Sequence, residues 1–153
     1  MDTEGTVAPT TAADARERYE AFGSTAQVVV KEVAKAMEMD RAEYRDRVTG
    51  DVVETARDAL FASTLEVRVG TREEFDQWVD DHDEYEVRET GSEHVDNVVW
   101  HVVPAADTVV AATYQDEREA AVGTLRRQAF GRVYRDLVTD ENGERSEQAD
   151  ADE

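Results

Sequence analysis

Apolar residues are most concentrated between residues 97 and 138 of the chain. The segments NVVWHVV (97–103) and TVVAATY (108–114) are nearly continuous apolar runs, joined by a short link that begins at Pro104. Strands in the middle of a sheet show such runs, whereas half-exposed strands alternate apolar and polar residues. We therefore predict that the two segments form a central β-hairpin.

A long amphipathic segment, residues 116–138, follows this hairpin and is predicted to be a helix. At the helical period of about 100° per residue, its apolar residues fall on one broad face. They are Val122, Leu125, Ala129, Phe130, Val133, Tyr134 and Leu137. Arg126 falls near the middle of that face, while Arg127, Arg132 and Arg135 point elsewhere.

A cation among apolar neighbours has three ways to keep its charge stable. It pairs with a carboxylate inside the fold, it extends its head to solvent along its own stem, or it binds an anionic ligand or partner. We expect the first of these for Arg126, and the other two remain alternatives. Residues 120–135 hold four arginines and no acid, so this region reverses the sign of an otherwise acidic chain.

The N-terminal half reads as a series of helices. Residues 1–10 are polar and are expected to be mobile, and helices are predicted from residue 11 to 22, from 24 to about 39, in the forties, and from 51 to about 63. The second helix carries an apolar stripe that we expect to pack inward. That stripe consists of Ala26, Val29, Val30, Val33, Ala34 and Met37.

Two further strands are predicted from a change of period to two. Residues 65–69 and 85–90 alternate apolar and polar side chains, and between them Thr71 and Glu74 form the capping box of another helix. The expected fold class is α+β, with N-terminal helices packed on a four-stranded mixed or antiparallel sheet and a long C-terminal helix. We place the two alternating strands at the sheet edges. The single domain is expected to span residues 11–138, and residues 139–153 form an acidic tail that we expect to be disordered.

Composition is more informative about the environment of the protein than about its function. The chain of 153 residues has 37 acids, 17 bases and a formal net charge of -20, and only Lys31 and Lys35 are lysines. Such acidity is typical of adaptation to molar salt, where the Debye length falls to about 3 Å and self-repulsion is screened. The alternatives are a partner with a basic surface and mimicry of a nucleic acid. The chain has no cysteine and no run long enough to span a membrane, so we expect a cytoplasmic protein without thiol chemistry.

Most catalytic and ligand-binding motifs are absent from the sequence. It has no glycine-rich phosphate loop, nucleophile elbow, zinc-binding HExxH or calcium loop, and we expect no metal and no cofactor. His82 lies between two aspartates in a charged loop, which is typical of a solvated surface. His101 falls on the strand face of Val99 and Val103, opposite Trp100. We expect it to be hydrogen-bonded core; the alternative is a general base that titrates near neutrality.

Two long stretches carry a family resemblance. The segments DALFASTLEVRVGTREEF (58–75) and EREAAVGTLRRQAFGRVYRDL (117–137), with the start MDTEGTVAPTT, resemble an uncharacterised group of short acidic proteins from salt-loving archaea. The resemblance implies a cytoplasmic haloarchaeal protein. It brings no catalytic residues with it.

The function class that fits these observations best is an interaction or regulatory module without catalysis. It would bind a protein partner or form a homodimer through the sheet or the last helix, because apolar strand faces need a cover. Nucleic acid is disfavoured by the negative field. The alternative is a small enzyme or anionic-ligand-binding domain with a pocket near Trp100, His101, Tyr114 and Arg126. The candidate ligand or partner residues are these four together with Arg127, Arg132 and Arg135.

Overall fold

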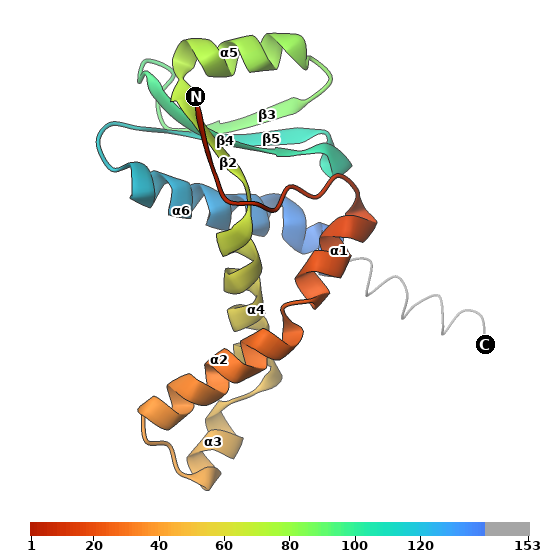
Figure 1. Cartoon of the computed structure of the whole chain (residues 1–153), viewed down its shortest axis with the longest axis vertical. Coiled ribbons are helices and arrows are strands. Elements are labelled where there is room, and N and C mark those ends of the chain that lie inside the picture. Colours follow the sequence, from red (N-terminus) through yellow and green to blue (C-terminus); the bar gives the residue numbers. More distant parts are fainter. Residues whose placement is uncertain (140–153) are drawn as a thin grey trace, which may run out of the picture.

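The computed structural model describes residues 1–139 and confirms the α+β class. A five-stranded sheet lies between α5 (Arg72–Asp81) on one face and α6 (Arg118–Ala129) on the other (Figure 1). The chain continues beyond α6 into a π-helical turn, η2 (Phe130–Tyr134). The helices α2 (Gly23–Ala36) and α3 (Arg41–Arg47), with the first half of α4 (Gly50–Thr64), extend away from these layers (Figure 1).

The sheet has the strand order β1-β2-β4-β5-β3. Its strands are β1 (Asp2–Glu4), β2 (Val67–Thr71), β3 (Glu86–Thr90), β4 (Asn97–Val103) and β5 (Thr108–Tyr114). The predicted central hairpin is present: β4 and β5 are antiparallel, with Trp100 opposite Ala111, and a short 3-10 turn, η1 (Pro104–Ala106), joins them. Only β3 runs parallel to its neighbour, β5. The sheet is therefore mixed.

The N-terminal segment differs from the prediction, because it belongs to the fold. Residues 2–4 form β1, which pairs antiparallel with β2, so β2 is an interior strand and only β3 of the two alternating strands lies at an edge. Arg118 of α6 binds both acids of β1, with N–O distances of 3.0 Å to Asp2 and 2.7 Å to Glu4. These contacts hold a polar segment that has too few apolar residues to be predicted as a strand. The predicted acidic tail lies almost wholly beyond the described residues.

Both faces of the sheet are covered by helices. On one side, α1 (Ala12–Glu20), the end of α4 and α6 pack their apolar residues against the strands, and Phe61 contacts the rings of Tyr19, Phe130 and Tyr134. On the other side α5 covers a smaller core in which the rings of Phe75 and Trp100 lie 5.2 Å apart. The capping box predicted at the start of α5 is confirmed. Burial on both faces explains the nearly continuous apolar runs of β4 and β5.

Candidate functional site

Arg126, expected to pair with an acid, instead binds a helix end. Its Nε donates to the carbonyl oxygen of Leu65 at 2.9 Å, and Leu65 is the C-cap of α4. Within residues 1–139, no carboxylate lies within ion-pair distance of its guanidinium. The carbonyl groups at a helix C-terminus carry partial negative charge and stabilise a cation. The end of α4 therefore takes the place of the predicted carboxylate, and the Arg126 side chain is half-buried.

The guanidinium of Arg126 also borders the N-terminal segment. A Cβ atom on Gly5 would lie 2.7 Å from Nη2 of Arg126, and Gly5 has a φ of +93° that favours glycine. The backbone amides of Thr6 and Val7 donate to the carbonyl of Thr64. The space beside Arg126 is thus filled by the chain itself.

His101 is part of the core. Only 1% of its surface is exposed, its Nδ1 lies 2.5 Å from the Glu66 carbonyl, and its Nε2 lies 2.7 Å from the Tyr134 hydroxyl. These contacts fit a neutral ring that donates from Nδ1 and accepts from Tyr134 at Nε2. Burial lowers the pKa of His101 from 6.5 to about 4, because it penalises the charged form, and the positive charges of Arg68 and Arg126 act in the same direction. The expectation of hydrogen-bonded core holds, and the ring is not poised to titrate near neutrality.

Trp100 and Tyr114 lie apart from His101 and from each other. Trp100 is fully buried on the α5 side and lines a cavity of about 470 Å³ with Trp78 and Glu74. Tyr114 lines a different cavity of about 310 Å³, between the end of β5 and α6. Neither His101 nor Arg126 lines either of these cavities, so the four residues proposed for one pocket do not share one.

The other three candidate arginines occupy separate positions after the start of α6. Arg127 and Arg132 are exposed, and Arg127 donates to the Thr124 hydroxyl at 3.2 Å. Arg135 lies over the ring of Phe130 and 3.9 Å from a carboxylate oxygen of Asp58. These arginines therefore give the surface a local excess of positive charge, but their side chains do not meet at one pocket.

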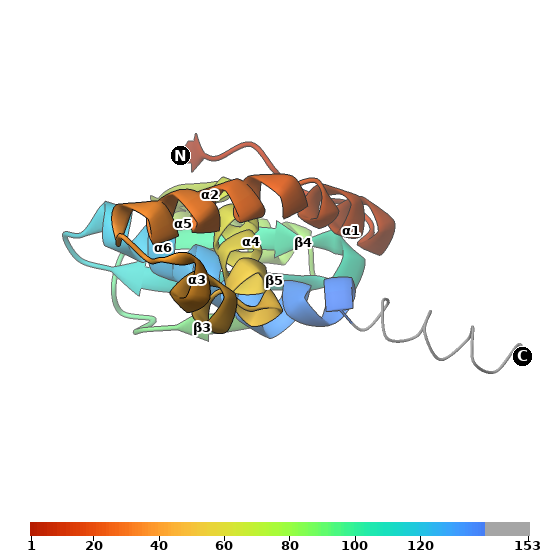
Figure 2. The same cartoon turned by 90° about the horizontal axis from the view of Figure 1, so that it is seen from below.

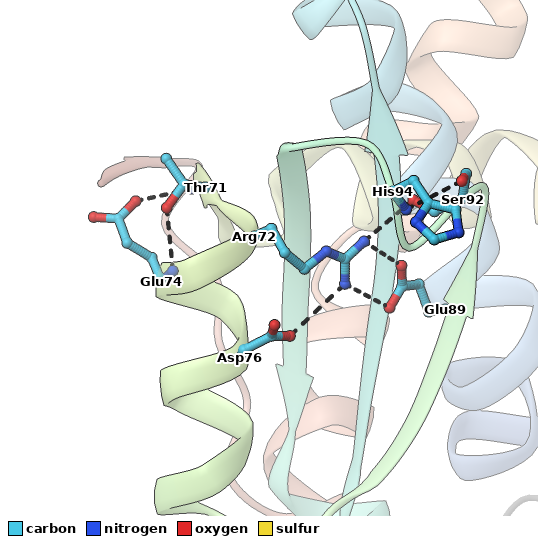
Figure 3. A network of polar contacts seen from close by, with 7 residues as sticks. All are labelled: Thr71, Arg72, Glu74, Asp76, Glu89, Ser92 and His94. Atoms are coloured by element: carbon cyan, nitrogen blue, oxygen red, sulfur yellow. Dashed lines mark hydrogen bonds and ion pairs between the residues drawn. The ribbon is translucent and has the colours of Figure 1, made fainter.

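A polar network that the sequence did not reveal joins α5 to β3 (Figure 3). Arg72 donates to both carboxylate oxygens of Glu89, at 3.1 and 2.6 Å, and to the Ser92 carbonyl at 3.3 Å. Glu89 raises the pKa of Arg72 through these bonds. Both side chains are about one-fifth exposed, and Asp76 lies 3.8 Å from the guanidinium. The paired hydrogen bonds between Arg72 and Glu89 connect the first turn of α5 to the edge strand β3.

The surface that stands out is on α2 and α3. We call residues 23–50, which comprise these two helices, the helical arm. Within the described part of the chain, eight large apolar side chains are exposed, and five of them belong to the helical arm. They are Val28, Val29, Val33, Met37 and Tyr44. Val33 and Met37 are 53% and 61% exposed, although the sequence pattern places them on an inward face.

The apolar face of α2 is wider than the surface available to cover it. At 100° per residue, the predicted stripe spans an arc of about 140°. Three of its residues, Ala26, Val30 and Ala34, are buried where α2 packs against α4. The other three, Val29, Val33 and Met37, are 38%, 53% and 61% exposed and form what we call the α2 stripe. The sequence shows how wide the apolar stripe of α2 is. It does not show which of these residues are exposed, because their exposure depends on the arm extending away from the sheet.

Charge also sets the helical arm apart. It contains five acids and five bases, so its formal charge is zero in a chain of net charge -20. The acids and bases are interspersed along the arm, and Lys35 lies 3.6 Å from Glu32. Two copies of this protein would therefore repel each other least if they met through their arms.

These features define a class: a small α+β domain that presents an exposed apolar helix on a neutral arm. A family model covers residues 6–135, and the chain belongs to that family, which is described as a family of unknown function (DUF5809). No curated protein and no solved structure was found to match the chain. Among residues 1–139, no helix is long and apolar enough to cross a membrane, and no group of three His, Asp or Glu side chains is placed to hold a metal ion.

Proposed function

We propose that this protein is a non-catalytic interaction or regulatory module that associates with a second copy of itself through the α2 stripe. The observation that carries the proposal is the half-covered apolar face of α2. Exposed contiguous apolar surface on a soluble domain marks a site of association, and a helix stripe at positions i, i+4 and i+8 suits helix-to-helix packing. Val29, Val33 and Met37 have this spacing.

The proposed contact surface differs from the one expected from the sequence, which was the sheet or the last helix. Both faces of the sheet have helical cover, and its two edges are short and charged: β1 reads DTE and β3 reads EVRET. Short charged edges oppose strand pairing between molecules. The α2 stripe has neither obstacle, and a twofold axis near Val33 would bury the stripes of both copies against each other.

The proposed setting is the cytoplasm of a haloarchaeon. The net charge of -20 supports this, because a dense carboxylate surface stays soluble at molar salt, where repulsion between copies is screened. Molar salt also strengthens the burial of apolar surface, provided that the salt is excluded from the protein surface. Both effects favour association through an apolar stripe.

Light scattering in about 3 M KCl, where the Debye length is below about 3 Å, tests the proposal. We expect a dimer for the wild type and a monomer for Val33→Glu, because the variant places a charge in the centre of the contact. The matched control is Val87→Glu, which changes an exposed valine on the edge strand β3 (39% exposed) and should remain a dimer. A monomeric wild type at high protein concentration, or a dimeric Val33→Glu, would contradict the proposal.

A further inference from the structure

A hollow in the helical arm lies on the side of α2 away from the α2 stripe. It has a volume of about 650 Å³ and lies between α2, α3 and the start of α4. Its lining includes Val28, Lys31, Tyr44, Val48, Thr49 and Val53. A second hollow of about 290 Å³ shares Lys31 and Tyr44 with the first and continues between α2 and α3. Figure 2 shows α2 and α3 from below, with α4 beside them.

The charge around these hollows is the reverse of the charge of the chain. Three cations line them, Lys31, Lys35 and Arg41, against one carboxylate, Asp40. That carboxylate already accepts the backbone N–H of Glu43 at 2.8 Å as the cap of α3. The chain as a whole has 37 acids against 17 bases, yet among the described residues no acid lines the larger hollow. Both lysines of the protein, Lys31 and Lys35, therefore line these two hollows.

Lys31 has no carboxylate partner that would compete with a ligand. Within residues 1–139 the ion pairs of the arm involve Lys35 and Glu32 only, at 3.6 Å. Thr49 precedes α4, yet its hydroxyl does not cap that helix, so the hydroxyl remains available to a ligand. The first turn of α4 carries the positive end of a helix dipole, but Asp51 in that turn offsets it. Selection for negative charge therefore comes from Lys31 and the Thr49 hydroxyl.

The rest of the lining is apolar. Val28 is 57% exposed, Val48 and Val53 are half-buried, and α3 contributes no buried residue to the arm. An apolar body placed over Val28, Val48 and Val53 would remove this surface from water and give α3 a surface to pack on. Ligand sites in proteins combine such an apolar lining with a few polar groups that fix orientation.

We propose that the hollow between α2, α3 and α4 binds a small amphipathic carboxylate, with its head on Lys31 and its apolar tail over Val28, Val48 and Val53. The site is independent of self-association, because Lys31 lies two residues, or about 200° of helical rotation, from Val33. It also differs from the anionic-ligand site near Arg126 that the sequence left as an alternative, because the chain itself fills the space beside Arg126.

Isothermal titration calorimetry of the full chain in molar KCl with octanoate tests the proposal. We expect saturable binding of octanoate, with no comparable binding of octylammonium, which has the same tail and the opposite charge, or of acetate, which lacks the tail. Lys31→Gln should weaken octanoate binding at least tenfold, as expected for loss of one charge-assisted contact. Arg47→Gln, a change of a cation in α3 outside the lining, should leave it unchanged.

Three results would overturn the proposal: no saturable binding of octanoate, equal binding of octylammonium, or full affinity in Lys31→Gln. Saturable binding of an acidic peptide in place of octanoate would likewise show that the occupant is a protein segment. The same titration on Val33→Glu separates the two proposals. A variant that no longer dimerises but still binds octanoate supports both, and a failure of one measurement leaves the other standing.

Discussion

Arg126 lies on an apolar helix face and, among residues 1–139, has the end of α4 and no carboxylate as its partner. The carbonyl of Leu65 accepts its Nε–H at the end of α4. Because this contact is a charge-assisted bond at a half-buried helix terminus, we expect Arg126→Met to cost about 1 to 2 kcal/mol of stability. If Arg126 instead paired with a buried carboxylate, Arg126→Met would leave that carboxylate unpaired and would cost more, about 3 to 5 kcal/mol.

Urea unfolding in molar KCl measures this cost, with Arg127→Met as the control on the exposed side of the same helix. The control should change stability by no more than about 0.5 kcal/mol. A loss above about 3 kcal/mol for Arg126→Met would indicate an acidic partner after all.

His101 gives the fold a pH dependence whose sign follows from its burial. The pKa of the ring is 6.5 in the unfolded chain and about 4 in the fold, so between these values the unfolded state binds a proton that the folded state does not. The contribution of the neutral ring is fully present above pH 6.5 and is lost as the pH falls toward 4.

Between pH 7.5 and 5.5, wild-type stability should therefore fall by about 1 kcal/mol more than that of His101→Gln, which keeps hydrogen-bonding groups but does not titrate. The difference between the two proteins removes the contribution of the carboxylates that they share. Parallel pH profiles for the two proteins would show that His101 is not a buried neutral ring.

At the scale of elements, Arg72 and Glu89 tie the first turn of α5 to the edge strand β3. Glu89→Gln keeps the shape but breaks the charged pair and leaves a partly buried guanidinium without its main partner. We expect a loss of about 2 kcal/mol in urea unfolding, in the range for hydrogen bonds to charged groups.

The control is Glu86→Gln on the same strand, where the pair with Arg88 is longer, at 3.6 Å, and its side chains are more exposed. Pairs of that kind contribute between 0 and about 1 kcal/mol. Equal losses for the two variants would contradict the special role of the Arg72 network.

The elements also show what the sequence could and could not predict. Periodicity was sufficient for β4, β5, α5 and α6, because each packs a complete apolar face within the chain. It failed for β1, whose three residues are held by Arg118 and by pairing with β2, both far away in the sequence. The π-helical turn η2 was also missed, since its pattern reads as ordinary helix.

For α2, the pattern predicted the helix and the apolar residues but not which half of them is buried. Exposure depends on where the arm points, and that is decided by packing between α2 and α4. Among the candidate site residues, the sequence placed Trp100 and His101 on opposite strand faces, as found. It could not show that the Leu65 carbonyl at the end of α4 accepts a hydrogen bond from Arg126, because that contact joins residues 61 positions apart.

At the scale of the whole molecule, the net charge of -20 makes stability depend on salt. Lowering KCl from about 3 M to about 0.1 M lengthens the Debye length to about 10 Å and exposes the carboxylates to one another. We expect a lower melting temperature and partial loss of structure at low salt, measured by circular dichroism. An unchanged melting temperature across this range would contradict the proposed adaptation to high salt.

Covalent capture is the most direct test of the proposed self-association through the α2 stripe. The chain has no cysteine, so Val33→Cys introduces a single thiol, which a twofold axis through the stripe would place against its own copy. Under mild oxidation in molar KCl, we predict that Val33→Cys becomes a disulfide-linked dimer, while Val87→Cys, on the exposed edge of the sheet, stays largely uncrosslinked. Equal crosslinking of the two variants, or a Val33→Cys protein that remains monomeric, would contradict the account.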